Sequence, residues 1–274
     1  MWKEILPALG VVSSVGLLAG ILLAVVSRFF YVEEDETAKR LRDCLPGINC
    51  GACGFKGCRD YSKALAQGTA TPNLCIPGGT ATAEELGRIL GVEATAPKDL
   101  IAFVACNGTK EATGKKAEYR GVNTCRGAAM LYGGPNTCVY GCIGLGDCAN
   151  ACPSGAICMV DGLAHVEASR CMGCGLCERT CPKQVIHMVP HEGGTVVRCA
   201  NRDRGAEARK TCANACIGCK KCEKACPRGA ITVKDQLARV DYERCDGCGA
   251  CVSLCPTGAL RQLRFPKHVA VFEE

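Results

Sequence analysis

The sequence predicts an α+β chain that consists of small modules in series, preceded by one long N-terminal helix. Three observations support this fold class. Eight of the 26 cysteines recur at a constant offset of 74 residues, residues 5–27 contain no charged side chain, and a separate cysteine motif lies between these two features. Because self-similarity at a fixed period marks a repeated folding unit, we expect one small module to be present twice.

The repeat is strict at its cysteines. The first copy contains, in order, Cys138, Cys142, Cys148, Cys152, Cys171, Cys174, Cys177 and Cys181. The second copy contains Cys212, Cys216, Cys222, Cys226, Cys245, Cys248, Cys251 and Cys255. The surrounding text repeats as well, since DGLAHVEASRCMGCGLCERTCP at 161 corresponds to DQLARVDYERCDGCGACVSLCP at 235.

Each copy contains the run C-x2-C-x2-C-x3-C-P, which is typical of [4Fe–4S] ligation in bacterial ferredoxins. Disulfides and zinc are the two alternatives for a cysteine-rich chain. A disulfide framework does not need this spacing, and zinc does not need the third and fourth cysteine or the proline. The sequence therefore predicts iron–sulfur clusters. Their thiols must be reduced, which favours a reducing compartment.

Composition agrees with small, cluster-bound modules. Aromatic residues make up only 5% of the chain, so metal cross-links must supplement the apolar cores. The formal net charge is +6. Each oxidised cluster with its four thiolates contributes about −2, so five clusters would bring the balance to about −4. We therefore expect no nucleic-acid partner. The basic residues near the clusters either offset cluster charge, meet an acidic partner, or are ordinary solvated surface: Lys220, Lys221, Lys224, Arg228 and Arg244.

The N-terminal segment, residues 1–30, is predicted to be a transmembrane anchor. Ile5–Ser27 is long enough to cross a bilayer as a helix. The basic residues Arg28, Lys39 and Arg40 follow it, which favours a cytoplasmic location for the rest of the chain. A cleaved signal peptide is the competing interpretation, but the segment lacks a basic region before it. The expected location is thus the cytoplasmic membrane, with a single pass and cytoplasmic cluster domains.

Residues 31–80 are predicted to form a small helical [4Fe–4S] domain. Its motif is Cys50-x2-Cys53-x4-Cys58, and Cys75 supplies the fourth ligand across a helix predicted at 60–66. Residues 81–133 are predicted to be a connecting segment, with a helix at 83–90 and a buried strand at 100–105. We assign no chemistry to this segment.

Residues 134–190 and 191–265 are predicted to be two ferredoxin-like modules with two clusters each, followed by a tail at 266–274. In ferredoxins of this pattern, the fourth cysteine of each run ligates the neighbouring cluster. This rule predicts three ligand sets: Cys152, Cys171, Cys174 and Cys177; Cys226, Cys245, Cys248 and Cys251; and Cys216, Cys219, Cys222 and Cys255. The copies differ at one ligand, because Leu145 occupies the position that corresponds to Cys219. Ligand counting names Cys138 as the substitute, which predicts a set of Cys138, Cys142, Cys148 and Cys181.

The five sets leave six cysteines without a role: Cys44, Cys106, Cys125, Cys158, Cys199 and Cys212. Buried free cysteines behave as small apolar residues, which is the simpler interpretation of these six. A sixth cluster assembled from them is the alternative. Cys125 and Cys199 are also 74 residues apart, which suggests a shared structural position. No G-x-G-x-x-G motif is present, so we expect neither flavin nor NAD on this chain.

The combination of an apolar N-terminal segment, LPGINCGACGFKGC, YGCIGLGDCANACP and the tandem repeats closely resembles the B subunit of the Rnf complex over essentially the whole chain. The resemblance implies a component of a membrane complex that oxidises reduced ferredoxin, reduces NAD and pumps sodium ions or protons. Its partners would be soluble ferredoxin and the other subunits of the complex. This chain would relay electrons through five [4Fe–4S] clusters, without a catalytic residue of its own.

Three alternatives stay open. The complex could pass electrons to a redox-sensing regulator or another acceptor. The chain could be an iron–sulfur enzyme subunit with an open, substrate-binding cluster, although each cluster has four candidate cysteines. It could also be a purely structural metal protein. The pumped ion, the potentials of the clusters and the order of electron flow are not encoded in any motif.

Overall fold

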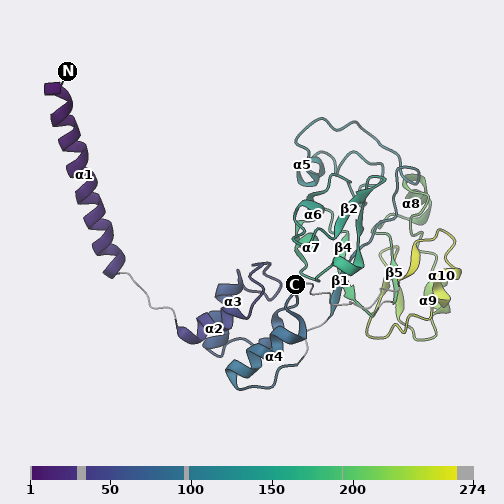
Figure 1. Ribbon diagram of the computed structural model, residues 1–274. Coiled ribbons are helices and arrows are strands. Elements are labelled where there is room, and N and C mark those ends of the chain that lie inside the picture. Colours follow the sequence, from purple (N-terminus) through teal and green to yellow (C-terminus); the bar gives the residue numbers. More distant parts are fainter. Residues whose placement is uncertain (1, 30–34, 96–98, 193, 264–274) are drawn as a thin grey trace.

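The computed structural model describes residues 2–29, 35–95, 99–192 and 194–263; in the first helix it describes the side chains of Gly10 and residues 13–28. That helix, α1 (Trp2–Phe29), extends away from the remaining elements (Figure 1). The predicted tail, 266–274, lies outside the described residues.

The prediction that the N-terminal segment spans a membrane is contradicted. Over the described part of the chain, no helix is both long enough and apolar enough to cross a bilayer. A spanning helix needs about 20 consecutive apolar residues. The continuous run of described side chains in α1, 13–28, is shorter, and the rest of the predicted span lies outside it. The fold class is therefore corrected to α+β without an assigned transmembrane helix.

The N-terminal cysteine motif belongs to a small helical unit. It contains α2 (Glu36–Asp43), α3 (Cys58–Ala66), the short 3-10 helix η1 (Pro72–Leu74) and α4 (Gly79–Leu90). Asp35 caps α2 by accepting a hydrogen bond from the Thr37 N–H at 2.9 Å, and α4 ends at Gly91 in the left-handed conformation. The helices predicted at 60–66 and 83–90 are confirmed. Leu41, Tyr61 and Leu86 form the core of this unit.

The first repeat folds as two antiparallel strand pairs with short helices. Strand β1 (Leu100–Val104) pairs with β4 (Ile186–Pro190), and β2 (Ile157–Val160) pairs with β3 (Leu163–Val166). The helices are α5 (Cys125–Ala129), α6 (Asp147–Asn150), η2 (Ala168–Arg170) and α7 (Leu176–Thr180). The strand predicted at 100–105 is confirmed. Its partner β4 places it in the first module, although the sequence had assigned it to the connecting segment.

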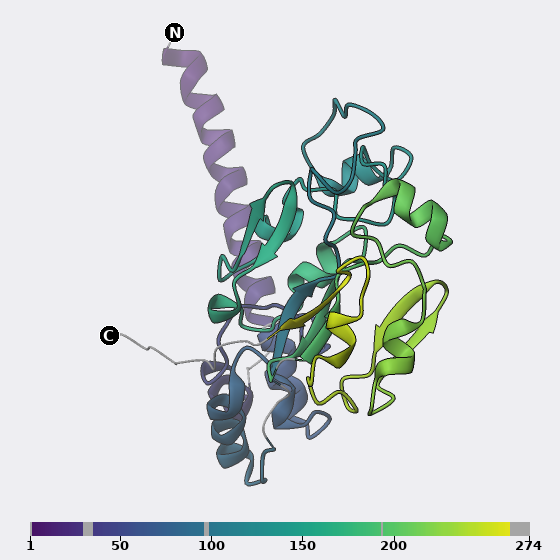
Figure 2. The same cartoon turned by 90° about the vertical axis from the view of Figure 1, so that its right-hand side faces the viewer.

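The second repeat has the same architecture. Strand β5 (Gly194–Val197) pairs with β8 (Leu260–Leu263), and β6 (Ile231–Lys234) pairs with β7 (Leu237–Val240). Its helices are α8 (Gly205–Thr211), α9 (Lys221–Ala225) and α10 (Ala250–Ser253). In Figure 2 the hairpins β2–β3 and β6–β7 lie on opposite sides of the central strands. The two modules thus face each other through these central strands.

The first strand of each module does not follow the 74-residue offset. Strand β1 corresponds to β5 in its pairing with the last strand of the module, but it lies about twenty residues farther from the first cysteine of the repeat. The additional residues lie between β1 and Cys138 and include α5. This insertion distinguishes the two modules, and it carries two of the cysteines to which the sequence assigned no role.

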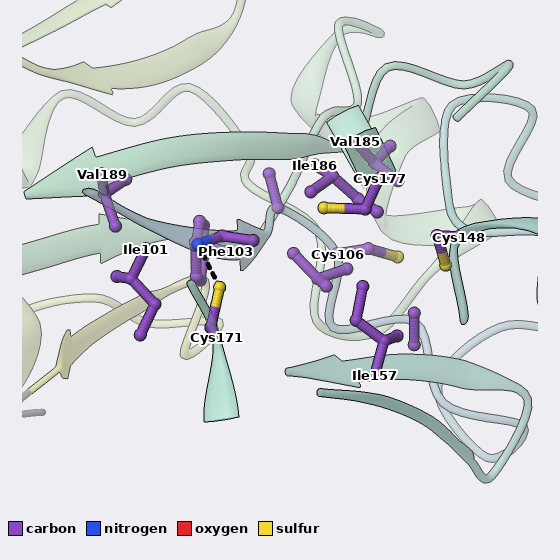
Figure 3. Packing of buried hydrophobic residues seen from close by; sticks show 14 of the residues in the cluster. Ile101, Phe103, Cys106, Cys148, Ile157, Cys171, Cys177, Val185, Ile186 and Val189 are labelled. Carbon is purple, nitrogen blue, oxygen red and sulfur yellow. Dashed lines mark hydrogen bonds between the residues drawn. The ribbon is translucent and has the colours of Figure 1, made fainter. Parts of the chain in front are cut away.

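The core of the first module combines aliphatic side chains with sulfur. Ile101 and Val185 are fully buried, and Ile186 is 1% exposed. Figure 3 shows the thiols of Cys106, Cys148, Cys171 and Cys177 among these side chains, between the β1–β4 pair and β2. The cysteines are therefore held by the same packing that holds the strands together.

Candidate iron–sulfur sites

The N-terminal site is organised around the loop that precedes α3. Asn49 has a left-handed backbone, with φ of 52°, and its Oδ1 accepts the Cys58 N–H at 2.9 Å. The buried Tyr61 hydroxyl donates to the Thr71 carbonyl oxygen at 2.7 Å, which fixes the chain just before Cys75. Burial raises the pKa of Cys75 to about 11, and its neighbours Cys50, Cys53 and Cys58 raise it further. The structure therefore brings together all four cysteines of the predicted set.

This site adjoins the first module. Both ends of the Arg179 guanidinium donate to backbone carbonyl oxygens of the N-terminal motif, one to Gly51 at 3.3 Å and the other to Cys50. Arg179 belongs to α7, which follows the second cysteine run of the first module. Cys174 of that run interacts electrostatically with Cys50. Arg179 thus anchors the N-terminal site next to a site of the module.

The predicted set around Cys177 also converges. Burial raises the pKa of Cys177 to about 12, and Cys171 and Cys174 add to this rise. Cys152 joins them through its electrostatic interaction with Cys174. Backbone N–H groups already point at two of the sulfurs: Ala102 donates to Cys171 at 3.5 Å, drawn in Figure 3, and Ala156 donates to Cys152 at 3.3 Å. Such hydrogen bonds to sulfur stabilise a thiolate ligand.

The corresponding set in the second module has the same features. The Ala230 N–H donates to Cys226 at 3.3 Å, as Ala156 does in the first module. Burial raises the pKa of the Cys251 thiol, and Cys226 and Cys245 contribute in the same direction. Cys248, the fourth member, is exposed, and its backbone N–H is held by Asp246 Oδ1 at 3.2 Å.

The remaining set of the second module lines a single cavity of about 370 Å³ of space free of protein atoms, measured out to its open mouth. Its walls contain Cys216, Cys219, Cys222 and Cys255. Burial raises the pKa of Cys222 to about 11, with further contributions from Cys216 and Cys219. All four cysteines predicted from ligand counting therefore face the same space.

The first module differs from the sequence-based ligand set at the position of Leu145. Its cavity, of about 360 Å³ measured in the same way, is lined by Cys125, Cys142, Cys148 and Cys181. Burial raises the pKa of Cys148 to about 11, followed by contributions from Cys125 and Cys181. Cys138 does not line this cavity, and lies at a different one. The structure thus brings together three of the predicted cysteines, with Cys125 as the fourth.

Local hydrogen bonds explain how Cys125 reaches this position. It begins α5, where the N-cap Thr124 accepts the Gly127 N–H at 3.1 Å. The carboxylate of Asp147, the first residue of α6, accepts the N–H of Cys125 at 2.8 Å and that of Arg126 at 3.1 Å. An acidic side chain in this position is favoured by the helix dipole. Asp147 therefore places α5 directly beside Cys148, the next residue in the chain.

Two other cysteines have a simple structural account. The Cys44 thiol donates to the Arg40 carbonyl oxygen at 3.3 Å, one turn earlier in α2. Cys158 lies on β2 and is exposed. Cys125 and Cys199 do not share a structural position despite their offset, because Cys125 begins α5 whereas Cys199 follows β5. The pattern that could have revealed Cys106 is the cysteine two residues after a buried strand, which FVAC shares with VVRC at 196–199.

The donor sets fit [4Fe–4S] clusters, because each consists of four cysteines and several receive backbone N–H groups at sulfur. Among the residues that the structure describes, no three His, Cys, Asp or Glu side chains are close enough to hold one metal ion. A cluster does not need such convergence, since its four thiolates bind four different iron atoms. The arrangement is therefore suited to polynuclear iron sites.

Comparison with protein families agrees with this interpretation. A family described as an Fe–S cluster matches residues 45–77, which includes the N-terminal motif. Two families described as 4Fe-4S dicluster domains match residues 170–231 and 215–259. Together these matches include the cysteine runs of the N-terminal unit and of the second module, and the second run of the first module.

Three relatives match most of the chain, and each is the B subunit of a redox-driven ion pump. The one from Acetobacterium woodii belongs to the Na⁺-translocating ferredoxin:NAD⁺ oxidoreductase complex and is 40% identical over 89% of this chain and 74% of the relative. The one from Clostridium ljungdahlii belongs to the proton-translocating ferredoxin:NAD⁺ oxidoreductase complex and is 41% identical over 87% of this chain and 85% of the relative. The one from the ion-translocating oxidoreductase complex of Methanosarcina acetivorans is 37% identical over 89% and 93%, respectively.

Proposed function

Because this chain belongs to the family of B subunits of the ion-translocating ferredoxin:NAD oxidoreductase (Rnf) complexes, we propose that it accepts electrons from reduced ferredoxin and relays them to partner subunits. It is an iron–sulfur electron-transfer subunit of an oxidoreductase and translocase complex, and the ion-translocating and NAD-reducing steps belong to other subunits. The observation that carries this proposal is the cavity lined by Cys216, Cys219, Cys222 and Cys255, within the region matched by a dicluster family.

When bound, [4Fe–4S] clusters supply reversible one-electron transfer at potentials set by the surrounding charge, hydrogen bonds and solvent exposure. Our proposed ligand sets are those predicted from the sequence, except that Cys125 replaces Cys138 beside Cys142, Cys148 and Cys181. The protein contributes thiolates, backbone N–H donors to sulfur, and burial of most ligands away from water. Exclusion of water and preformed hydrogen bonds keep the sites rigid, which reduces the reorganisation that accompanies a change of charge.

The surface around Cys219 supports a protein partner as the electron donor. Cys219 is exposed, and so are its neighbours Lys220, Lys221 and Lys224. A cluster of lysines at an exposed redox site attracts an acidic partner and accelerates its encounter. We propose that reduced ferredoxin docks at this lysine patch, defined as Lys220, Lys221 and Lys224.

The thiol chemistry supports the cellular compartment. Ligation requires reduced cysteines, and reduced thiols persist in the cytoplasm rather than in an oxidising space. We therefore propose that the described cluster sites, from Cys50 onward, face the cytoplasm. Attachment to a membrane would then come through the partner subunits of the complex.

The experiment that tests this function uses the purified complex. Replacing Cys222→Ala should abolish or strongly reduce ferredoxin-dependent NAD⁺ reduction, because one ligand set loses a member. The matched control is Cys158→Ala, since Cys158 is exposed and belongs to no set. NADH oxidation with an artificial acceptor should persist in both variants. Full ferredoxin-dependent activity in the Cys222→Ala complex would contradict the proposal.

A further inference from the structure

Four cysteines that share no predicted set surround a cavity where the two modules meet. They are Cys106, Cys138, Cys199 and Cys212. The cavity contains about 380 Å³ of space free of protein atoms, nearly the same as the 370 Å³ and 360 Å³ of the two cavities described above. Cys106, Cys199 and Cys212 are buried, and all four are free thiols. Cys138 interacts electrostatically with each of the other three.

The four cysteines come in two pairs that follow the duplication of the fold. Cys106 lies two residues after the end of β1, and Cys199 lies two residues after the end of β5. Cys138 and Cys212 are related by the 74-residue offset. Each module therefore contributes one cysteine from its first strand and one from the start of its first cysteine run. A site built in this way has the approximate twofold symmetry of the modules themselves.

Backbone hydrogen bonds to sulfur repeat this symmetry. Cys106 Sγ accepts the N–H groups of Gly108 and Cys142, both at 3.4 Å. Cys199 Sγ accepts the N–H of Asn201 at 3.4 Å and that of Cys216 at 3.2 Å. In both modules one donor is therefore two residues further along the chain, and the other belongs to the neighbouring cysteine run. Two N–H donors at each sulfur favour its thiolate form.

The walls of the cavity are polar where a charged group would need them to be. Asn201 is 1% exposed, and its side-chain amide lies 3.7 Å from Cys138 Sγ. Arg198, half-buried, also lines the cavity and places a positive charge there. An ideal Cβ at Gly141 would lie 3.4 Å from Cys106 Sγ and 3.7 Å from Cys138 Sγ, so the backbone of Gly141 lines the space between these two thiols.

Further hydrogen bonds hold the modules together around this cavity. Thr113 Oγ1 donates to the Thr211 carbonyl oxygen at 2.8 Å, and the Asn214 side-chain amide donates to the Asn107 carbonyl oxygen at 2.9 Å. The Ala213 N–H donates to the Ala112 carbonyl oxygen at 2.9 Å. The chain segments that carry Cys106 and Cys212 are thereby fixed relative to each other across the junction.

We propose that Cys106, Cys138, Cys199 and Cys212 hold a sixth [4Fe–4S] cluster at the junction of the two modules. A mononuclear zinc site is disfavoured, because zinc needs its ligands about 2.1–2.3 Å from one point, and no three described candidate side chains meet this requirement. The inference deepens the proposed function and rests on it: a relay through two separate modules is completed by a site to which both contribute ligands.

The test is the iron and sulfide content of the full chain, purified anaerobically and reconstituted with iron and sulfide. Six clusters correspond to about 24 iron atoms per chain and five to about 20. Cys138→Ala and Cys212→Ala should each remove about four iron atoms. The double variant should lose the same four rather than eight, because both residues serve one cluster. Cys158→Ala is the matched control and should lose none.

This pattern separates the sixth site from the ligand-counting alternative. If Cys138 completed the set with Cys142, Cys148 and Cys181, Cys212 would be spare and Cys212→Ala would keep all its iron. That result, a double variant that loses eight, or zinc at this site would overturn the proposal. Electron paramagnetic resonance (EPR) of the reduced protein and circular dichroism show whether the other clusters and the fold persist. Cys212→Ser provides a second, milder variant. A wild-type chain without iron would instead overturn the proposed function as a whole.

Discussion

Cys125 provides the sharpest single-residue prediction. Replacing it by alanine should remove the cluster bound by Cys142, Cys148 and Cys181, because a [4Fe–4S] cluster needs a fourth thiolate. The expected loss is about four of 24 iron atoms, one sixth of the total. The other sites do not use Cys125, so their signals should remain. The loss of packing at this position should be small, since the change removes a single sulfur atom.

The second module supplies a rescue for this variant. Leu145 corresponds to Cys219 at the 74-residue offset, and it packs in the same small core as Cys125. In Cys125→Ala/Leu145→Cys, a thiolate should return to the position that Cys219 occupies in the second module. Leucine to cysteine at this partly buried position should cost about 1–2 kcal/mol of stability. The cluster should nevertheless return.

The assay is iron and sulfide content with EPR spin quantification after reduction, measured in parallel on the wild type, Cys125→Ala and the double variant. We expect full, five-sixths and full occupancy, respectively. Cys158→Ala again serves as the control for a cysteine outside every site. Full occupancy in Cys125→Ala would refute the assignment of Cys125. Failure of Leu145→Cys to restore iron would refute the structural equivalence of the two cavities.

Three further predictions follow from other features. Gly173→Ala should disrupt the first module, because an ideal Cβ would lie 2.4 Å from a β1 carbonyl oxygen, whereas Gly175→Ala meets no atom within 4 Å and has the same φ of +68°; melting followed by circular dichroism should show only about 1–2 kcal/mol of destabilisation for Gly175→Ala. Lys220→Glu/Lys221→Glu should raise KM for ferredoxin about tenfold at low salt and less at high salt, and no change would argue against docking at the lysine patch. Burial raises the pKa of Cys177 to about 12, so this thiol is protonated at pH 7 and must lose its proton on ligation; reconstitution should therefore release protons and slow as the pH falls, and a pH-independent rate without proton release would contradict this reasoning.

The sequence predicts those parts of the fold that depend on local spacing. The cysteine runs, the prolines after them and the short helices at 60–66 and 83–90 are local signals, and the structure contains the predicted helices. The strand at 100–105 is also recognisable as a short apolar run. Its pairing is not, because its partner β4 lies more than eighty residues later in the chain and no local pattern encodes that distance. The first module therefore begins earlier than the repeat suggests.

The candidate sites show the same division between local and long-range information. Sets that lie within one 74-residue unit can be derived by counting ligands. Cys125 cannot, because an insertion carries it and Asp147 holds it in place through tertiary hydrogen bonds. Cys106 and Cys212 belong to different modules, so their proximity depends on how the modules pack. The constant offset was misleading for Cys199, whose structural counterpart is Cys106 at a spacing of 93 residues.

The N-terminal helix is the third difference. Its length and lack of charge in the sequence predicted a membrane span, but the described residues contain no helix that satisfies both requirements. The cluster sites do not depend on that helix. All the proposed ligands lie at or after Cys50, in the described units that follow α1.

The central claim is that this chain takes electrons from ferredoxin, and rapid mixing of the two proteins tests it most directly. The full chain, loaded with its clusters and kept anaerobic, is mixed with reduced ferredoxin while visible absorbance is recorded. Our account predicts rapid bleaching of the iron–sulfur absorbance of the chain, slowed by salt and by the Lys220→Glu/Lys221→Glu change. The claim would be contradicted if the chain stayed oxidised with ferredoxin while dithionite reduced it fully.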